Sequence, residues 1–447
     1  MFRNEKGEPT LHIDPRLGAI TIGEPVTTEK QLKEAFKGYK LRETLNLFGE
    51  LSKNIFNKNI PYPFEFIGVG GIRHPAGIIV SQFAIEYLAN IFLISGANDF
   101  KSESLKNKDN FLGLFNIYNN SVIHPRLEGR DISSLLVPMS FEQFRSQISA
   151  QDMFVRQWVI FNTLREQIGN ADFEDINAVI KNGTGLTIEE IIKLSLTIFA
   201  YLIHNPLFNI GNLSGTTVES FKGILTDEKI GSFLNLYTAT YPQIRELDGA
   251  LNPNLIDEYT KTRFNPLWKK PIIKLEENLY LAPSITAYIT ATFYGIFWWF
   301  DDYYRKISRK RQMDFRKYFG LLFEGYVGLV LKDIYGEESV RTQIKYGLKG
   351  KEIDSTDWTV TQEEKVYLFE VKAYQFPLDV LQKGNPDAIR KEVTNKLVEA
   401  VRQVYQRVQD IEIYPELADL RGKKIIPIVV FYDIPLVSSS MYDHSLN

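Results

Sequence analysis

The chain has 447 residues, 44% of them hydrophobic, a formal net charge of −3 and no cysteine. This length is enough for two or three domains with separate cores. The lack of cysteine excludes disulfides, thiolate metal sites and a cysteine nucleophile, and the near-neutral charge argues against a protein that coats nucleic acid.

Helical patterns dominate residues 1–252, which we expect to form a recognition or regulatory region that binds a protein partner or a second copy of the chain. After an extended segment over 11–26, the pattern predicts one helix from Thr28 to Phe56, with Thr28 as its cap. Residues 78–97 predict a core helix, because three polar side chains interrupt the apolar run.

A linker, a hairpin and a helix are expected over residues 253–311. Residues 270–282 predict the hairpin, with its turn at 276–278. Residues 284–300 are uncharged but too short to span a bilayer, so they predict a buried helix. We therefore expect a cytoplasmic protein with no membrane partner, and the N-terminus lacks the apolar core of a signal peptide.

Residues 312–447 predict a third region, in which a helix, three strands, a helix and a strand follow one another. The first helix covers 312–335, and the strands cover 339–346, 351–360 and 365–373. A long helix follows over 387–413, and the apolar run 424–432 is typical of a buried strand.

The two neighbouring strands over 351–360 and 365–373 carry the strongest chemical signal. Because side chains alternate along a strand, Glu370 and Lys372 face the same way, and Asp357 lies near the end of the preceding strand. Charged groups on an apolar strand are costly unless they are paired or bind an ion. Asp354 is the alternative carboxylate, but it would face away from Asp357 in a regular strand, so we expect it to be solvated beside Lys351 or Lys365.

This element order, with Glu324 on the first helix, Asp357 on the second strand and the Glu370-Val-Lys372 run on the third, resembles the PD-(D/E)xK, or restriction-endonuclease-like, nuclease superfamily. The resemblance covers about the last third of the chain, and Thr356 stands where the family name has proline. It implies an α/β core of order αβββαβ, with a mixed central sheet flanked by helices, behind a mainly α-helical N-terminal region.

The resemblance also implies a role for each residue. Asp357, Glu370 and the backbone carbonyl of Val371 would hold Mg²⁺ or Mn²⁺, which prefer oxygen ligands. Lys372 would orient water or stabilise charge on the phosphate, and Glu324 would complete the acidic pocket. Gln403, on the later helix, is an accessory candidate.

Basic residues near these carboxylates are candidates for binding the nucleic-acid backbone. Most lie in the run before the first helix, and the others lie near the first strand turn and on the later helix: Arg305, Lys306, Arg309, Lys310, Arg311, Lys345, Lys349, Lys396 and Arg407. Superfamily frequency favours DNA over RNA and an endonuclease over an exonuclease, and a helical module beside a nuclease is typical of antiviral-defence or restriction effectors. An RNA-cleaving effector and a catalytically inactive nuclease-like scaffold remain as alternatives.

Overall fold

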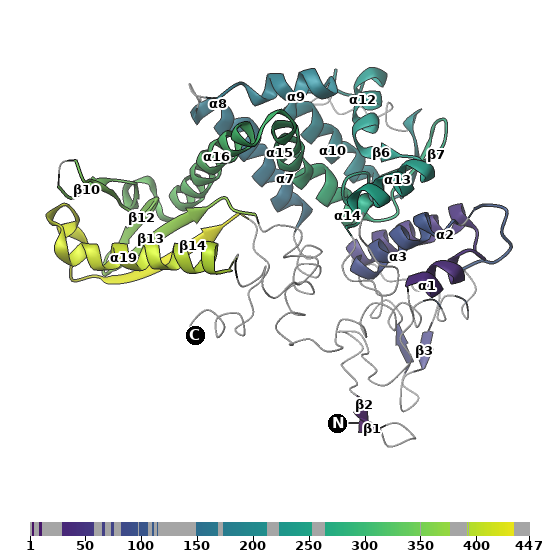
Figure 1. Cartoon of the computed structure of the whole chain (residues 1–447), viewed down its shortest axis with the longest axis horizontal. Helices are drawn as coiled ribbons and strands as arrows, with labels where there is room; N and C mark the ends of the chain where they lie inside the picture. Colours follow the sequence, from purple (N-terminus) through teal and green to yellow (C-terminus); the bar gives the residue numbers. More distant parts are fainter. Residues whose placement is uncertain are drawn as a thin grey trace. The chain divides into compact units, whose positions relative to one another are not determined.

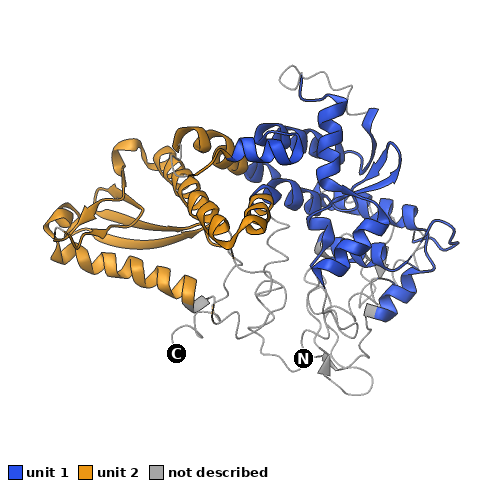
Figure 2. Ribbon diagram, turned by 45° about the horizontal axis from the view of Figure 1, so that its top comes forward, with its two compact units in different colours: residues 1–154, 176–297 blue, residues 155–175, 298–447 orange. Residues whose placement is uncertain are grey.

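Two compact units make up the computed structural model, and Figure 2 colours them blue and orange. Unit 1 comprises residues 1–154 and 176–297, and unit 2 comprises residues 155–175 and 298–447. The residues described are 2–3, 9–10, 29–57, 65–67, 73–75, 82–96, 98–105, 110, 114, 149–168, 173–211, 223–252, 264–348, 350–375, 391 and 393–432.

The units divide the chain at other points than the expected boundaries at 252 and 311. Unit 2 includes 155–175, a segment that the sequence assigns to the N-terminal region. Within unit 2, the ring of Phe161 stacks on Phe319 at 5.6 Å, and Gln157 donates a hydrogen bond of 2.8 Å to the Tyr432 hydroxyl. Contacts between residues so distant in sequence cannot be detected from changes in composition along the chain.

Unit 1 is mainly helical. The single helix predicted from Thr28 to Phe56 is wrong, because α1 (Glu29–Phe36) and α2 (Leu41–Phe56) are separate helices. Between them, the Lys40 N–H donates to the Glu103 carbonyl at 3.1 Å, which draws the backbone out of the helical pattern. Thr28 and the expected segment 11–26 lie outside the described residues. The helix expected over 78–97 is confirmed as α3 (Gln82–Ile94).

The remaining described elements of unit 1 are helices around a small four-stranded sheet of order β5-β8-β7-β6. The expected hairpin is confirmed as β7 (Ile272–Glu276) and β8 (Leu279–Leu281). The helix expected over 284–300 is confirmed as a continuous helical run through α14, η5 and α15, which passes into unit 2. The other bounds are β5 Leu207–Asn209, β6 Thr238–Ala239, α9 Ile176–Thr184, α10 Ile188–Leu202, α12 Asp227–Tyr237, α13 Tyr241–Leu251, α14 Ile285–Ile289, η5 Thr290–Tyr294 and α15 Gly295–Ile307.

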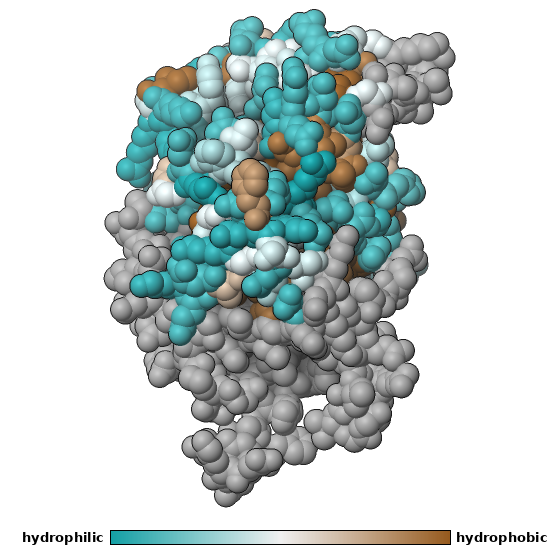
Figure 3. Space-filling view, turned by 90° about the vertical axis from the view of Figure 1, so that its right-hand side faces the viewer, coloured by the Kyte–Doolittle hydropathy of each residue, from teal (hydrophilic) through white to brown (hydrophobic). Residues whose placement is uncertain are grey.

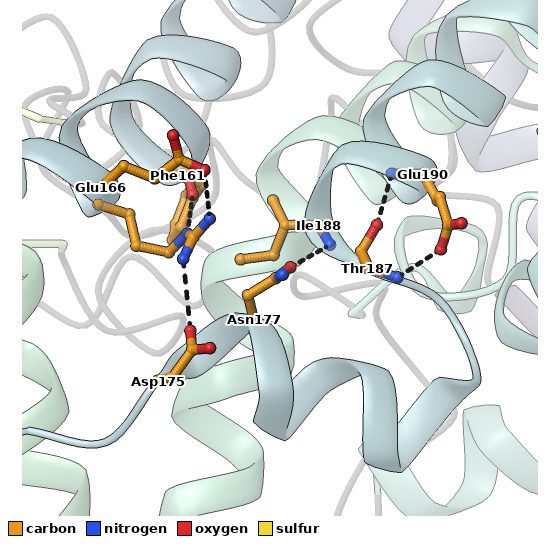
Figure 4. A network of polar contacts seen from close by, with 8 residues as sticks. Phe161, Glu166, Asp175, Asn177, Thr187, Ile188 and Glu190 are labelled. Atoms are coloured by element: carbon orange, nitrogen blue, oxygen red, sulfur yellow. Dashed lines mark hydrogen bonds and ion pairs between the residues drawn. The ribbon is translucent and has the colours of Figure 1, made fainter.

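Local hydrogen bonds define the helix ends in both units (Figure 4). In unit 1, Thr187 and Glu190 form a reciprocal capping box at the start of α10. The Asn177 side chain accepts from the Ile188 N–H at 2.9 Å. In unit 2, Arg165 donates hydrogen bonds to the Phe161 carbonyl and to the carboxylates of Asp175 and Glu166. Its guanidinium group is therefore occupied by nearby groups of the same unit.

Among the described helices, none has the length and apolarity that crossing a bilayer requires. The polar interruptions of α3, Gln82, Glu86 and Asn90, are buried in unit 1. Gln82 pairs with Ser52, and Glu86 accepts from the Trp268 indole at 2.8 Å. The face drawn in Figure 3 is mainly hydrophilic where residues are coloured, with apolar residues gathered in smaller areas.

Unit 2 combines helices with a mixed four-stranded sheet of order β14-β13-β12-β9. β13 (Lys365–Lys372) runs antiparallel to β12 (Trp358–Gln362) and parallel to β14 (Lys424–Phe431), and β9 (Val340–Thr342) pairs with β12. Helices α16 (Arg309–Tyr335) and α19 (Glu399–Ile413) cover opposite faces of this sheet (Figure 1). On β13, Leu368 packs in a cluster with Val404 of α19, whereas the Tyr367 ring contacts Tyr335 of α16.

Two of the expected strands are broken in unit 2. The segments expected as 339–346 and 351–360 also supply β10 (Lys345–Tyr346) and β11 (Ile353–Asp354), which form a separate two-stranded hairpin. Gly347 and Gly350 have φ of 102° and 87°, backbone angles that turn this hairpin and that other residues rarely adopt. Tyr346 holds the hairpin to α19 by donating its hydroxyl to Asp410.

The last two predicted elements are present with changes. Within the helix expected over 387–413, the described part is a π-helix, η7 (Val393–Val398), continued by α19. The strand expected over 424–432 is confirmed as β14, but it is an edge strand and mostly half-buried. Its apolar composition suggested a fully buried strand, and its edge position explains the difference.

Candidate active site

β13 places Glu370 and Lys372 together near its C-terminal end. The Lys372 ammonium donates to Glu370 Oε1 at 2.6 Å, and the two side chains retain 32% and 11% of their exposure. They share the face of β13 that carries Leu368, because they are separated from it by even numbers of residues. The expected common orientation of this pair is confirmed.

Asp357 lies beside this pair because of the β12–β13 register. Trp358, the first residue of β12, pairs with Phe369, so Asp357, which directly precedes the strand instead of lying on it as expected, continues this register opposite Glu370. Asp357 Oδ2 accepts the Val371 N–H at 2.6 Å. The carboxylate is therefore fixed against the backbone of β13, between the two positions that carry Glu370 and Lys372.

The backbone carbonyl of Val371 points to the side of β13 on which Asp357 lies. Along a strand, successive carbonyls point to opposite sides. The Lys372 carbonyl accepts the Tyr432 N–H at 3.1 Å, on the side of β14. The Val371 carbonyl must then point to the side of β12, which is the side of Asp357.

Glu324 approaches the pocket from α16. Burial raises the pKa of its carboxyl, the negative charges of Asp357 and Glu370 act in the same direction, and the three causes together bring the pKa to about 7. Burial likewise raises the pKa of Asp357, the Val371 hydrogen bond lowers it, the charge of Glu370 adds to the increase, and the net value is about 6. Three carboxylates from three elements therefore interact electrostatically, with Lys372 as the neighbouring cation.

The donor set fits a hard divalent cation. No cluster of three His, Cys, Asp or Glu side chains suited to a metal occurs among the described residues. The set available is smaller, namely the carboxylates of Asp357 and Glu370 with the Val371 carbonyl. Mg²⁺ commonly uses only one or two carboxylates and keeps several waters, so all-oxygen donors of this number suit it. A cation there would also relieve the repulsion among the carboxylates.

Asp354, the alternative carboxylate, lies on a different strand from the one that follows Asp357, so strand alternation does not relate the two side chains. It belongs to β11, where it is exposed and pairs in register with Lys345 instead of Lys351 or Lys365. The chain bends between β11 and β12, because the Ser355 N–H donates to the Ile344 carbonyl. The charge of Asp354 makes a small contribution to raising the pKa of Asp357.

Several of the basic candidates are engaged within the fold. Arg305 donates to Asp302 at 2.6 Å, and Arg311 pairs with Glu174. Arg407 donates at 3.3 Å to Asp410. These three arginines therefore contact acidic side chains of the same unit.

The other basic candidates differ in their surroundings. Lys396 lies 5.1 Å above the ring of Tyr374, two residues beyond Lys372, which places it near the carboxylate pocket. Lys349 lies outside the described residues. The described members of this group are all exposed, namely Lys306, Arg309, Lys310, Lys345 and Lys396.

Three described glutamines of unit 2 have buried side-chain atoms without a hydrogen-bond partner, and Gln157 Oε1 is one of these atoms. Gln403, the accessory candidate, lies on α19 with its Oε1 in this state. Gln375, which the sequence did not single out, has both side-chain polar atoms in this state, three residues beyond Lys372. Gly328, which contacts Trp358 directly, was also not predicted from the sequence to be part of the site.

Comparison of the chain with known protein families, with curated proteins and with solved structures gives no match.

Proposed function

We propose that unit 2 is a metal-dependent nuclease that hydrolyses phosphodiester bonds, with DNA as the favoured substrate. The observation that carries this proposal is the meeting of Asp357, Glu370 and Lys372 at one end of β13, fixed by hydrogen bonds of 2.6 Å. A charged cluster this costly to bury is typical of a functional site. The αβββαβ order and the mixed sheet agree with the nuclease superfamily that the sequence resembles.

In this proposal, Asp357, Glu370 and the Val371 carbonyl hold Mg²⁺ or Mn²⁺. The bound ion would supply charge neutralisation at the phosphate and a more acidic water. Lys372 donates hydrogen bonds to the attacking water or to a phosphate oxygen, from its place 2.6 Å from Glu370.

Glu324 has a separate role as a proton carrier. With a pKa of about 7, its carboxyl changes protonation state near neutral pH. A group of this kind can accept the proton that the attacking water loses. The attack forms a bond between the water oxygen and phosphorus while the bond to the leaving oxygen breaks, and the leaving oxygen then takes up a proton.

The test uses the purified full chain with labelled linear duplex DNA, circular DNA, single-stranded DNA and RNA, in Mg²⁺, Mn²⁺ or EDTA. We expect cleavage of linear and circular DNA with either metal, none in EDTA, and loss in Asp357→Asn and Lys372→Ala. Lys365→Ala is the matched control, since Lys365 is exposed at the other end of β13. Cleavage that survives both site substitutions would overturn the site, and cleavage of RNA alone would replace DNA as substrate. Intact nucleic acid under every condition would favour the inactive scaffold.

A further inference from the structure

Trp358 connects two of the carboxylate-bearing elements. It follows Asp357 directly in the chain and begins β12, with only 8% of its surface exposed. Its indole N–H donates to the backbone carbonyl of Glu324 at 3.0 Å. One side chain thus links the segment that carries Asp357 to the turn of α16 that carries Glu324.

Gly328 makes this contact sterically feasible. It lies one helical turn after Glu324, and a Cβ at this position would lie 2.1 Å from the Trp358 ring. Such a distance is far inside van der Waals contact, so the indole occupies the space that any side chain at Gly328 would need. The ring therefore lies across the turn from Glu324 to Gly328.

The same turn is also closely packed by another segment of unit 2. A Cβ on Gly325 would lie 2.9 Å from Ile168 Cδ1 and 3.4 Å from Leu164 Cδ2. Glycines at 325 and 328 therefore allow two separate groups to approach the helix beside Glu324. Packing of this kind leaves the Glu324 backbone little freedom to shift.

We propose that Trp358 is a positioning residue that holds the Glu324 carboxylate at a fixed separation from Asp357. This inference rests on the proposed function for its catalytic consequence, although the link itself does not. Phenylalanine would fill much of the same volume, but only tryptophan carries the N–H that the Glu324 carbonyl receives. Ordinary core packing requires the ring and not the hydrogen bond, and this difference can be tested.

The first test is a double-mutant cycle of Trp358→Phe and Glu324→Gln, read as kcat and KM on the cleaved substrate. We expect Trp358→Phe to lower kcat about tenfold and to leave KM almost unchanged. Because Trp358 acts through Glu324, it should cause no further loss in the Glu324→Gln background. Phe369→Leu is the matched control, since Phe369 pairs with Trp358 in register, and its effect should add to that of Glu324→Gln.

The second test needs neither activity nor metal. Unfolding by urea at about pH 8 measures how much Glu324→Gln stabilises the chain by removing its repulsion with Asp357 and Glu370. If Trp358 holds Glu324 near them, that gain should fall by about half or more in the Trp358→Phe background, but persist beside Phe369→Leu.

The kinetic cycle and the unfolding cycle together distinguish the proposed nuclease function from the positioning role of Trp358. A chain that cleaves nothing but shows coupling on unfolding would overturn the proposed function and support the positioning role. Additive effects of Trp358→Phe and Glu324→Gln in the unfolding cycle would overturn the positioning role, whether or not the chain cleaves nucleic acid. Gly328→Ala provides a second variant, and it should reproduce the losses of Trp358→Phe because it displaces the indole.

Discussion

The acidic and the basic residues of unit 2 behave in opposite ways. The carboxylates of Glu324, Asp357 and Glu370 come from three segments and gather closely enough that Asp357 and Glu370 raise the pKa of Glu324, and Glu370 raises that of Asp357. The arginines of the basic run separate, since Arg305 and Arg311 pair with acidic residues of their own unit. Nearness in sequence therefore did not indicate a shared site, whereas strand register did.

The physical reason is the cost of each arrangement. An exposed arginine can form an ion pair with any nearby carboxylate, and such a pair changes the free energy of folding little. Half-buried carboxylates that repel one another must be held in place by the fold, because the repulsion opposes their approach. The acidic group is thus the stronger indicator of function, and substitutions among both the acidic and the basic residues test this difference.

Substitution of Lys372 on β13 and of Asp357, just before β12, should have the largest effect. We expect Lys372→Ala and Asp357→Asn each to lower kcat/KM for cleavage by about 100-fold or more, since each removes a group that acts on developing charge. Steady-state cleavage of a labelled duplex measures this, with Lys365→Ala beside it. Equal activities of Lys372→Ala and Lys365→Ala would contradict the claim that the carboxylate cluster with Lys372 is the functional site.

Arg407 should act on stability instead of nucleic-acid binding. It donates to Asp410, which is 4% exposed and also receives the Tyr346 hydroxyl. Arg407→Met should lower the unfolding free energy by about 2 kcal/mol, because a hydrogen bond to a buried charge is lost. Urea unfolding measures the loss. Unchanged stability together with weakened DNA binding would instead indicate that Arg407 contacts DNA.

Glu324 should destabilise the metal-free fold at high pH. Its pKa is about 7 in the folded chain, above the value of about 4.3 in an unfolded one, so the folded state holds the proton more tightly. The stability from this group is complete below the unfolded pKa and is lost as the pH rises through about 7. At about pH 8, Glu324→Gln should raise the unfolding free energy by about 1–2 kcal/mol, after allowance for solvent screening.

The pH dependence provides the control for this expectation. Near pH 4 the gain should disappear, because the folded and unfolded chains then both carry a largely protonated Glu324. Asp333 is an exposed carboxylate on the same helix, and Asp333→Asn should leave the unfolding free energy unchanged at both pH values. A gain that is equal at both pH values would show that packing, and not charge, is responsible.

The smallest effect is expected from the exposed members of the basic run. Arg309→Ala and Lys310→Ala should each reduce the slope of log K against log salt for DNA binding by up to about 1, the value for one phosphate contact. Arg311→Ala should change the slope less, since Glu174 already pairs with it. Fluorescence anisotropy in EDTA measures the three slopes, and an equal effect of all three would mean that the Glu174 pair opens on binding.

The sequence predicted the elements whose signal is local. β13 and α16 follow from clear alternation and helical periodicity, and the hairpin β7–β8 follows from its turn residues. The common face of Glu370 and Lys372 follows from strand geometry alone. The place of Asp357 beside them required only that two consecutive strands pair.

What the sequence could not predict depends on contacts distant along the chain. The break between β11 and β12 depends on a hydrogen bond from Ser355 to Ile344, and the anchoring of the β10–β11 hairpin depends on Asp410. The inclusion of residues 155–175 in unit 2 is of the same kind. Trp358 was visible as a neighbour of Asp357, but its hydrogen bond to Glu324 spans 34 residues and leaves no periodic pattern.

The most direct test of the central claim is a titration of the purified, metal-free chain with Mn²⁺, followed by electron paramagnetic resonance. We expect a saturable site in the wild-type chain that is lost in Asp357→Asn and Glu370→Gln and kept in Asp333→Asn. Competition by Mg²⁺ should release the bound Mn²⁺, since both ions prefer oxygen ligands. A wild-type chain that binds no Mn²⁺, or equal binding by all four proteins, would contradict the account.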